Sequence, residues 1–91
     1  MAVTVKIPTP LRNLTGDLSE VTAASDSITA LVEELEGVYP GMRERLVDEG
    51  GELLRFVNLF VNGEDIRFLE GLQTALGEGD EISIVPAVAG G

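Results

Sequence analysis

The feature that most constrains the fold is one amphipathic stretch with a helical period. Its apolar residues recur at positions i, i+3, i+4 and i+7, which together form one helix face: Ile28, Leu31, Val32 and Leu35. The intervening glutamates fall on the opposite face: Glu33, Glu34 and Glu36. Because such a helix must bury its apolar face against another layer, the rest of the chain has to supply that layer.

Residues at both ends set the bounds of this helix. A side-chain oxygen of Asp26 or Ser27 can accept hydrogen bonds from the free backbone N–H groups of the first turn. At the other end, Gly37 followed by Pro40 predicts that the helix stops there. The predicted helix therefore spans about three turns.

The segment before the helix has the alternation typical of half-buried strands. Val3, Val5 and Ile7 alternate with polar residues until two prolines end the pattern. After a turn over residues 13–17, a weaker stretch over residues 18–23 can return antiparallel to the first strand. The first third of the chain therefore predicts a pair of strands.

The segment after the helix contains the most β-like run of the chain, residues 53–61. Asn62-Gly63 follows it and favours a hairpin with a type I′ turn, because both residues accept a positive φ. Ile66 and Phe68 are then expected on the returning strand. This stretch predicts a second antiparallel pair.

Shorter pieces link these elements. Met42 and Leu46 indicate one further helical turn, and residues 48–52 contain no large apolar side chain and predict an exposed loop. Leu72 and Leu76 lie in a short connection that leads to the end of the chain.

The last predicted strand completes the fold class. Ile82 and Ile84 alternate with polar residues, and Pro86 ends the pattern. The order is then strand, strand, helix, strand, strand, strand. This order predicts an α+β fold in which one main helix lies across one face of a mixed sheet.

The length of 91 residues suits one domain, which we expect over residues 1–86. Residues 87–91, which read Ala-Val-Ala-Gly-Gly, contain no large side chain that could anchor them to a core. We therefore expect them to form a flexible C-terminal tail.

The composition excludes most kinds of enzyme chemistry. The chain contains no cysteine and no histidine, which removes disulfides, thiolate nucleophiles, imidazole bases and the usual zinc sites. Six basic against sixteen acidic residues give a net charge of −10, which repels nucleic acid and anionic membranes and favours a basic partner. No signal peptide and no membrane-spanning run is evident, so we expect a cytoplasmic protein.

Several clusters of acidic residues invite a metal or acid–base interpretation: Glu64-Asp65, Asp48-Glu49-Glu52 and Glu78-Asp80-Glu81. None has the spacing of a calcium loop, and none pairs with a nucleophile. We interpret them as solvated surface and predict no metal site. Gly77-x-Gly79 precedes a strand, whereas a dinucleotide-binding motif follows one, so this pair of glycines is not such a motif.

Taken together, these residues resemble the ubiquitin-like sulfur carriers of the MoaD/ThiS family over essentially the whole chain. The resemblance rests on the element order and on four segments: Val61-Asn62-Gly63, residues 71–76, residues 79–82 and the ending over residues 86–91. Within the family the chain is most similar to the CysO-type carriers of cysteine biosynthesis, through Arg55-Phe56-Val57-Asn58 and the ending. Ala87 departs from the Pro-Pro-Val of many MoaD tails.

The resemblance implies a β-grasp fold whose first and last strands are parallel and central. It also implies that the protein is not an enzyme but a substrate of an E1-like enzyme of the MoeB or ThiF type. That partner would use ATP and Mg²⁺ to adenylate the carboxylate of Gly91 and convert it to a thiocarboxylate. No cofactor would be bound by the carrier itself.

The tail would then thread into the partner's active site through Val88, Ala89 and Gly90. Glycine suits a narrow channel because it lacks Cβ and reaches conformations that other residues avoid. The sulfur would pass to an accepting synthase, which resembles a cysteine synthase, a thiazole synthase or the large subunit of molybdopterin synthase.

The strand register predicts a second site. If Val57, Leu59 and Val61 face the helix, Phe60 faces outward, and Val85 does so on the last strand. The family places these two strands side by side, so Phe60 and Val85 would form an exposed apolar patch near the tail, which Pro8 could join. Patches of this kind often mark partner surfaces, although single exposed apolar residues are common.

Three other functions remain open from the sequence. The chain could be the small subunit of molybdopterin synthase, a ubiquitin-like modifier that is conjugated to lysines, or a plain β-grasp interaction module. Lys6 is its sole lysine, so chains of the modifier on itself would have one acceptor.

Overall fold

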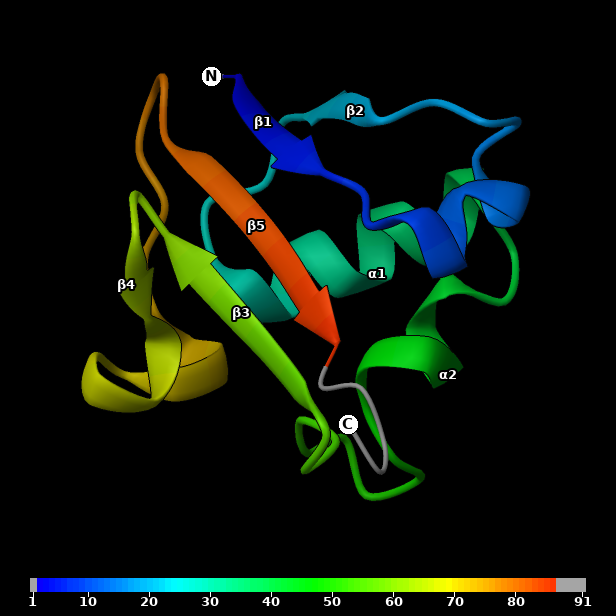
Figure 1. The fold of residues 1–91 in the computed structure, drawn as a ribbon. Helices are drawn as coiled ribbons and strands as arrows, with labels where there is room; N and C mark the ends of the chain where they lie inside the picture. The colour runs from blue at the N-terminus through cyan, green and yellow to red at the C-terminus, as the bar shows by residue number, and fades with distance from the viewer. Residues whose placement is uncertain (1, 87–91) are drawn as a thin grey trace.

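The computed structural model describes residues 2–86, which form a five-stranded sheet with one main helix packed across it (Figure 1). The strands are β1 (Val3–Lys6), β2 (Glu20–Ala23), β3 (Val57–Val61), β4 (Glu64–Asp65) and β5 (Glu81–Pro86). The helices are α1 (Ile28–Val38) and α2 (Met42–Leu46), with short 3₁₀ helices η1 (Thr9–Leu14), η2 (Ile66–Phe68) and η3 (Gly71–Gln73).

The sheet order is β2-β1-β5-β3-β4, so the first and last strands of the described chain lie together at its centre. β1 and β5 are parallel, with Val5 opposite Ile82, while the other neighbouring pairs are antiparallel. Parallel strands need a long crossover connection, and here α1 and the other intervening elements provide it. The predicted mixed sheet and the β-grasp topology are confirmed.

The core lies between α1 and the inner face of the sheet. Every apolar residue of the predicted helix face is buried, and Ile28 is completely inaccessible to solvent. From the sheet, Val5 and Ile82 are equally inaccessible. The periodicities of 3.6 and two residues in the sequence therefore correspond to the two sides of one core.

The start of α1 is as predicted, with Ser27 as its cap: the Ser27 hydroxyl accepts a hydrogen bond from the backbone N–H of Ala30, at 3.2 Å. The predicted end is confirmed, because the helix stops at Val38, between Gly37 and Pro40. Gly37 does not adopt a positive φ; the left-handed residue is Gly41, with φ of 100°. The Glu36 carboxylate accepts the Gly41 N–H there and turns the chain into α2.

The predicted strand over residues 53–61 is too long, because β3 begins only at Val57. The N–H of Leu54 donates to the carbonyl of Leu46, and the N–H of Val57 donates to the carbonyl of Leu54. These bonds hold residues 54–57 in a turn that follows α2. Arg55 and Phe56 therefore lie on the turn rather than on the strand.

The Asn62-Gly63 turn is confirmed, with φ of 52° and 89° at the two residues. The predicted returning strand is wrong, however, because β4 covers only two residues. The Asp65 carboxylate accepts the N–H of Arg67 and starts η2. Ile66 then enters the core, whereas Phe68 is 85% exposed. A local side-chain cap has replaced the strand ladder here.

The sequence also did not predict η1, where a strand end and a turn over residues 13–17 were expected. Pro10 lies in the first turn of η1, a position that tolerates its missing N–H. Leu11 is buried, and the Arg12 side chain donates to the carbonyl of Ile7. These contacts draw the segment back against the end of β1.

Asp80 links the β3–β4 hairpin to the start of β5. One of its carboxylate oxygens accepts the backbone N–H of Gly77 at 2.7 Å, and the other accepts the side-chain amide of Asn62 at 3.0 Å. Two hydrogen bonds hold the pKa of Asp80 below its ordinary range, because both favour the ionised carboxylate. The bond from the Gly77 N–H has the larger effect and the bond from the Asn62 side chain the smaller.

We expect this link to make stability depend on pH. A lowered pKa in the folded state stabilises the fold above the unfolded-state pKa, and that contribution is lost as pH falls through the folded-state pKa. Urea unfolding of the wild type and of Asp80→Asn should therefore differ at pH 7, and the difference should shrink below about pH 4. A constant difference from pH 7 to pH 3 would contradict this account.

Candidate functional site

The outer face of the sheet carries the predicted patch. Val57, Leu59 and Val61 are buried under α1, so the residues between them face the other way. Phe60 is half-buried on this outer face, and Val85 is 44% exposed. The register predicted for both strands is therefore confirmed, while a docking role for the patch stays a prediction.

The pairing of β3 with β5 brings the two apolar side chains together. Phe60 lies opposite Ser83 and Asn58 lies opposite Val85, so Phe60 and Val85 are diagonal neighbours on one face. In the parallel pair, Lys6 lies opposite Ser83, which is the last pair between β1 and β5. Pro8 lies beyond the end of β1, at the start of η1, so the sheet register brings together only Phe60 and Val85 of the three predicted patch residues.

Charged side chains lie beside the patch on the β1 and β2 side. The ammonium group of Lys6 forms ion pairs with Glu20 at 3.3 Å and with Glu81 at 3.9 Å. All three side chains are about half exposed, so these pairs contribute little to stability. They do place opposite charges next to an apolar surface, as at the rim of a protein interface.

β5 ends beside this patch, because its last residue, Pro86, directly follows Val85. Val57 of β3 is the partner of Pro86, the last described residue. The N–H of Asn62 donates to the carbonyl of Glu81, and hydrogen-bonded pairs alternate along an antiparallel ladder. By this alternation Pro86 falls at a non-hydrogen-bonded pair, so its missing N–H removes no bond to β3.

The predicted tail residues lie outside the described residues. These are Val88, Ala89 and Gly90, predicted to thread into a partner, and Gly91, predicted to carry the reactive carboxylate. The patch of Pro8, Phe60 and Val85 is therefore the part of the predicted site that can be located.

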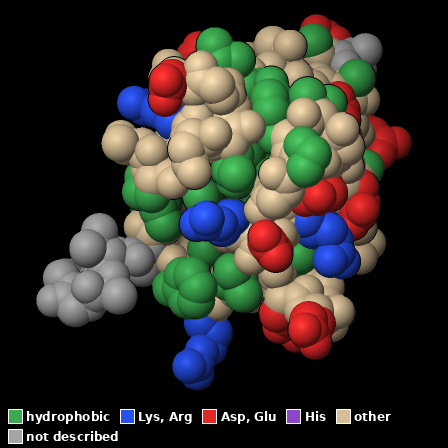
Figure 2. All heavy atoms as spheres, turned by 90° about the vertical axis from the view of Figure 1, so that its right-hand side faces the viewer, with side chains coloured by type: hydrophobic (Ala, Val, Ile, Leu, Met, Phe, Trp, Pro, Cys, Tyr) green, Lys and Arg blue, Asp and Glu red, His purple; other side chains and the backbone are tan. Residues whose placement is uncertain are grey.

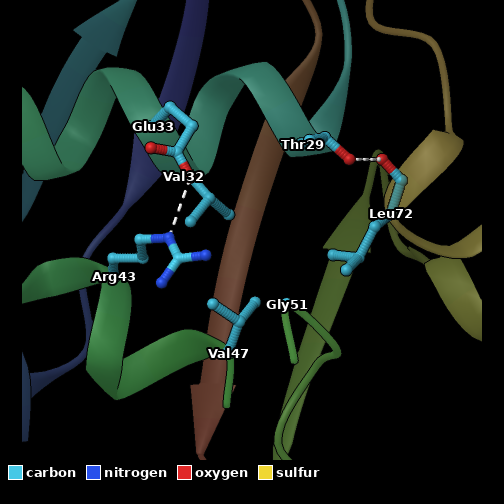
Figure 3. A pocket seen from close by; sticks show the side chains of 7 residues that line it. All are labelled: Thr29, Val32, Glu33, Arg43, Val47, Gly51 and Leu72. Carbon is cyan, nitrogen blue, oxygen red and sulfur yellow. Dashed lines mark hydrogen bonds and ion pairs between the residues drawn. The ribbon is translucent and has the colours of Figure 1, made fainter. Parts of the chain in front are cut away.

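A small cavity of about 80 Å³ lies between α1 and α2 (Figure 3). Its polar groups already bind one another: the Thr29 hydroxyl donates to the carbonyl of Leu72 at 2.8 Å, and Arg43 pairs with Glu33 at 2.8 Å. The remaining lining residues are Val32, Val47 and Gly51. Because the polar groups of the cavity are paired with one another, and these pairs link α1 to α2 and to η3, we interpret it as structural.

Over residues 2–86 no three acidic side chains come together in a way that could hold a metal ion. On the face shown in Figure 2, acidic side chains lie mainly to the right, basic ones are scattered, and hydrophobic ones gather at the lower left and over the upper middle. No helix in this range is long and apolar enough to cross a membrane.

The geometry defines the class of protein: a ubiquitin-like β-grasp domain with an apolar patch beside the end of its central last strand. The sequence comparison is more specific. The chain matches the ThiS family over residues 5–91 and belongs to that family.

Three similar proteins illustrate the relationship. The sulfur carrier protein CysO of Mycobacterium tuberculosis is 52% identical to the chain, over the full length of both. A crystal structure of the BexX/CysO complex of Amycolatopsis orientalis contains a chain that is 44% identical, with a TM-score of 0.92 over 98% of this chain and 99% of that one. Small archaeal modifier protein 3 of Haloferax volcanii is 37% identical over 88% of each chain.

These relationships bear out the predicted sulfur-carrier function, and the protein is a ubiquitin-like sulfur carrier. The turn over residues 54–57 was not expected from the sequence. Phe56 falls within the strand predicted over residues 53–61, whereas this side chain lies on the turn and is 56% exposed. The bond from the Val57 N–H to the Leu54 carbonyl closes a local four-residue turn, and a single turn of this kind leaves no periodic signal in the sequence.

Measurements of the free energy of unfolding can test whether neighbouring residues of β3 face opposite sides of the sheet. Phe60→Ser should lower the free energy of unfolding by less than about 1.5 kcal/mol, because Phe60 is half-exposed on the outer face. Leu59→Ala should cost about 2 to 5 kcal/mol, because Leu59 is 2% exposed and packs in the core. Equal losses in urea titrations of the two variants would show that the register is wrong.

Proposed function

We propose that the chain carries sulfur as a thiocarboxylate on Gly91, formed by an E1-like partner. The observation that carries this proposal is membership of the ThiS family together with full-length similarity to a sulfur carrier. The chain has no cysteine, so it has no thiol on which a persulfide could form. The Gly90-Gly91 ending supplies instead a carboxylate on a segment without side chains, which can enter a narrow channel.

The chemistry needs activation because a carboxylate is a poor electrophile. A carboxylate oxygen of Gly91 attacks the α-phosphorus of ATP, and pyrophosphate leaves. Hydrosulfide released by a sulfur donor then attacks the acyl carbon, the bond to the phosphate oxygen breaks and AMP leaves, and loss of the sulfur-bound proton to solvent gives the thiocarboxylate. The partner holds ATP and Mg²⁺ and stabilises the developing charge, so the carrier acts as a substrate and not as an enzyme.

The carrier body supplies position. Pro86 restricts the backbone direction at the end of β5, and the patch of Phe60, Val85 and Pro8 offers the partner an apolar contact close to that point. The net charge of −10 favours a partner whose surface is basic around this contact. Opposite charges would thus raise the association rate, and burial of the apolar patch would lower the dissociation rate.

The sulfur would pass to an accepting synthase in the cytoplasm, where ATP is available. Similarity to CysO favours cysteine as the product, and the relative crystallised in a BexX/CysO complex supports a carrier that docks onto a partner protein. We therefore place this chain in the cysteine branch of the family.

A second candidate function is protein modification. Its support is the similarity to small archaeal modifier protein 3. In that case Gly91 would form isopeptide bonds with target lysines, and the two functions share the activation step. A ladder of conjugates in cell extract, absent when Gly91 is deleted, would support the modifier function.

We expect a thiocarboxylate on the C-terminal peptide. Incubation with an activating enzyme of the MoeB or ThiF type, ATP and a sulfur donor should add the mass difference of one oxygen replaced by sulfur. Intact-protein and peptide mass spectrometry would locate the change.

The matched controls alter only the tail. A chain extended by one residue beyond Gly91, or one lacking Gly90 and Gly91, should fold like the wild type. Neither should show the mass increase for replacement of oxygen by sulfur. Modification of the truncated chain, or of a residue other than Gly91, would refute the proposal.

The docking patch predicts a further kinetic effect. Phe60→Asp should reduce the rate of activation at limiting carrier concentration by about tenfold or more, because it puts a charge where an apolar anchor is buried. Thr22→Asp adds the same charge on the exposed β2 strand of the same sheet and should have a small effect. Equal activation of Phe60→Asp and wild type would eliminate the patch as a docking site.

A further inference from the structure

The turn over residues 54–57 is held in place by a residue distant in sequence. The Arg67 guanidinium donates to the carbonyls of Leu54 at 3.1 Å and Val57 at 3.0 Å, and to the side chain of Asn58. Its own backbone N–H is bound by Asp65. Because Arg67 binds both ends of the turn, the turn has one defined conformation rather than that of a free loop.

This turn lies next to the point where the last strand ends. Val57, its final residue, is the partner of Pro86 in the sheet, and Asn58 is the partner of Val85. Figure 1 shows the start of β3 beside the end of β5. The two central residues of the turn, Arg55 and Phe56, are therefore within one or two residues of the strand pair from which the tail continues.

Both central residues are available for contact. The Phe56 side chain is 56% exposed although its backbone is fixed, so burying it in a partner would cost little ordering entropy. Arg55 is exposed, and its side chain has no hydrogen bond or ion pair with any residue in the range 2–86. Lys6 and Arg43, in contrast, are already paired with glutamates.

We propose that Arg55 and Phe56 form a second docking element for the activating enzyme, separate from the patch of Phe60, Val85 and Pro8. The inference rests on the proposed function, in which a partner binds the chain beyond Pro86. Such a partner has to approach the end of β5, where Val57 pairs with Pro86. The matching surface on the enzyme is an apolar pocket for the Phe56 ring beside a carboxylate for the Arg55 guanidinium, at the mouth of the tail channel. Arg67 is a positioning residue that presents both side chains.

The test measures thiocarboxylate formation on the full chain as a function of carrier concentration. Phe56→Ser should raise KM about tenfold or more and leave kcat within about twofold, because the contact is made in docking and not in the chemical step. Arg55→Glu should raise KM similarly, whereas Arg55→Lys should recover part of the loss. Arg67→Met should raise KM and speed hydrogen exchange of the Val57 N–H.

Phe68→Ser is the matched control, since Phe68 is an even more exposed phenylalanine, on η2 at the β4 side of the sheet. It should leave KM unchanged. If the wild type is activated and Phe56→Ser has the same KM, this inference fails while the proposed function stands. If the wild type is never activated by the enzyme, both fail.

Discussion

The parallel pairing of β1 with β5 is the interaction on which the rest of the structure depends. Val5 and Ile82 are partners at the centre of the sheet, and both are wholly inaccessible to solvent. The pairing joins segments from opposite ends of the described chain, so α1 has to cross between them and covers the inner face. It also directs the end of β5 to one end of the sheet, where β3 alone continues beside it.

That arrangement separates stability from function. The inner face, with α1 and residues such as Leu59, carries most of the apolar burial, while the outer face and the end of β5 carry the surfaces assigned to partners. Under the proposed function, the body must present the C-terminal carboxylate to its partners without changing its fold. A rigid sheet with a contact surface beside the last strand meets this need, because docking then positions the carboxylate without any rearrangement of the body.

Local patterns predicted the parts of the fold that depend on neighbouring residues. The Ile28, Leu31, Val32 and Leu35 face, the alternation in β1 and β5, and the positive φ at Asn62 and Gly63 are all confirmed. The prediction of the returning strand failed because a polar side chain competes with the expected ladder. Asp65 starts η2 in place of a longer strand.

The sequence by itself determined which residues of α1, β1, β3 and β5 face the core and which class of fold they build. Through its resemblance and its lack of cysteine, it also led to the proposal that sulfur is carried on a carboxylate. Periodicity does this because the direction of a side chain follows from the local backbone alone. Only the tertiary structure decided that Phe60 and Val85 are diagonal neighbours and that Arg67 holds the turn beside Pro86. Such contacts join segments far apart in the chain, so they depend on how the whole sheet is ordered.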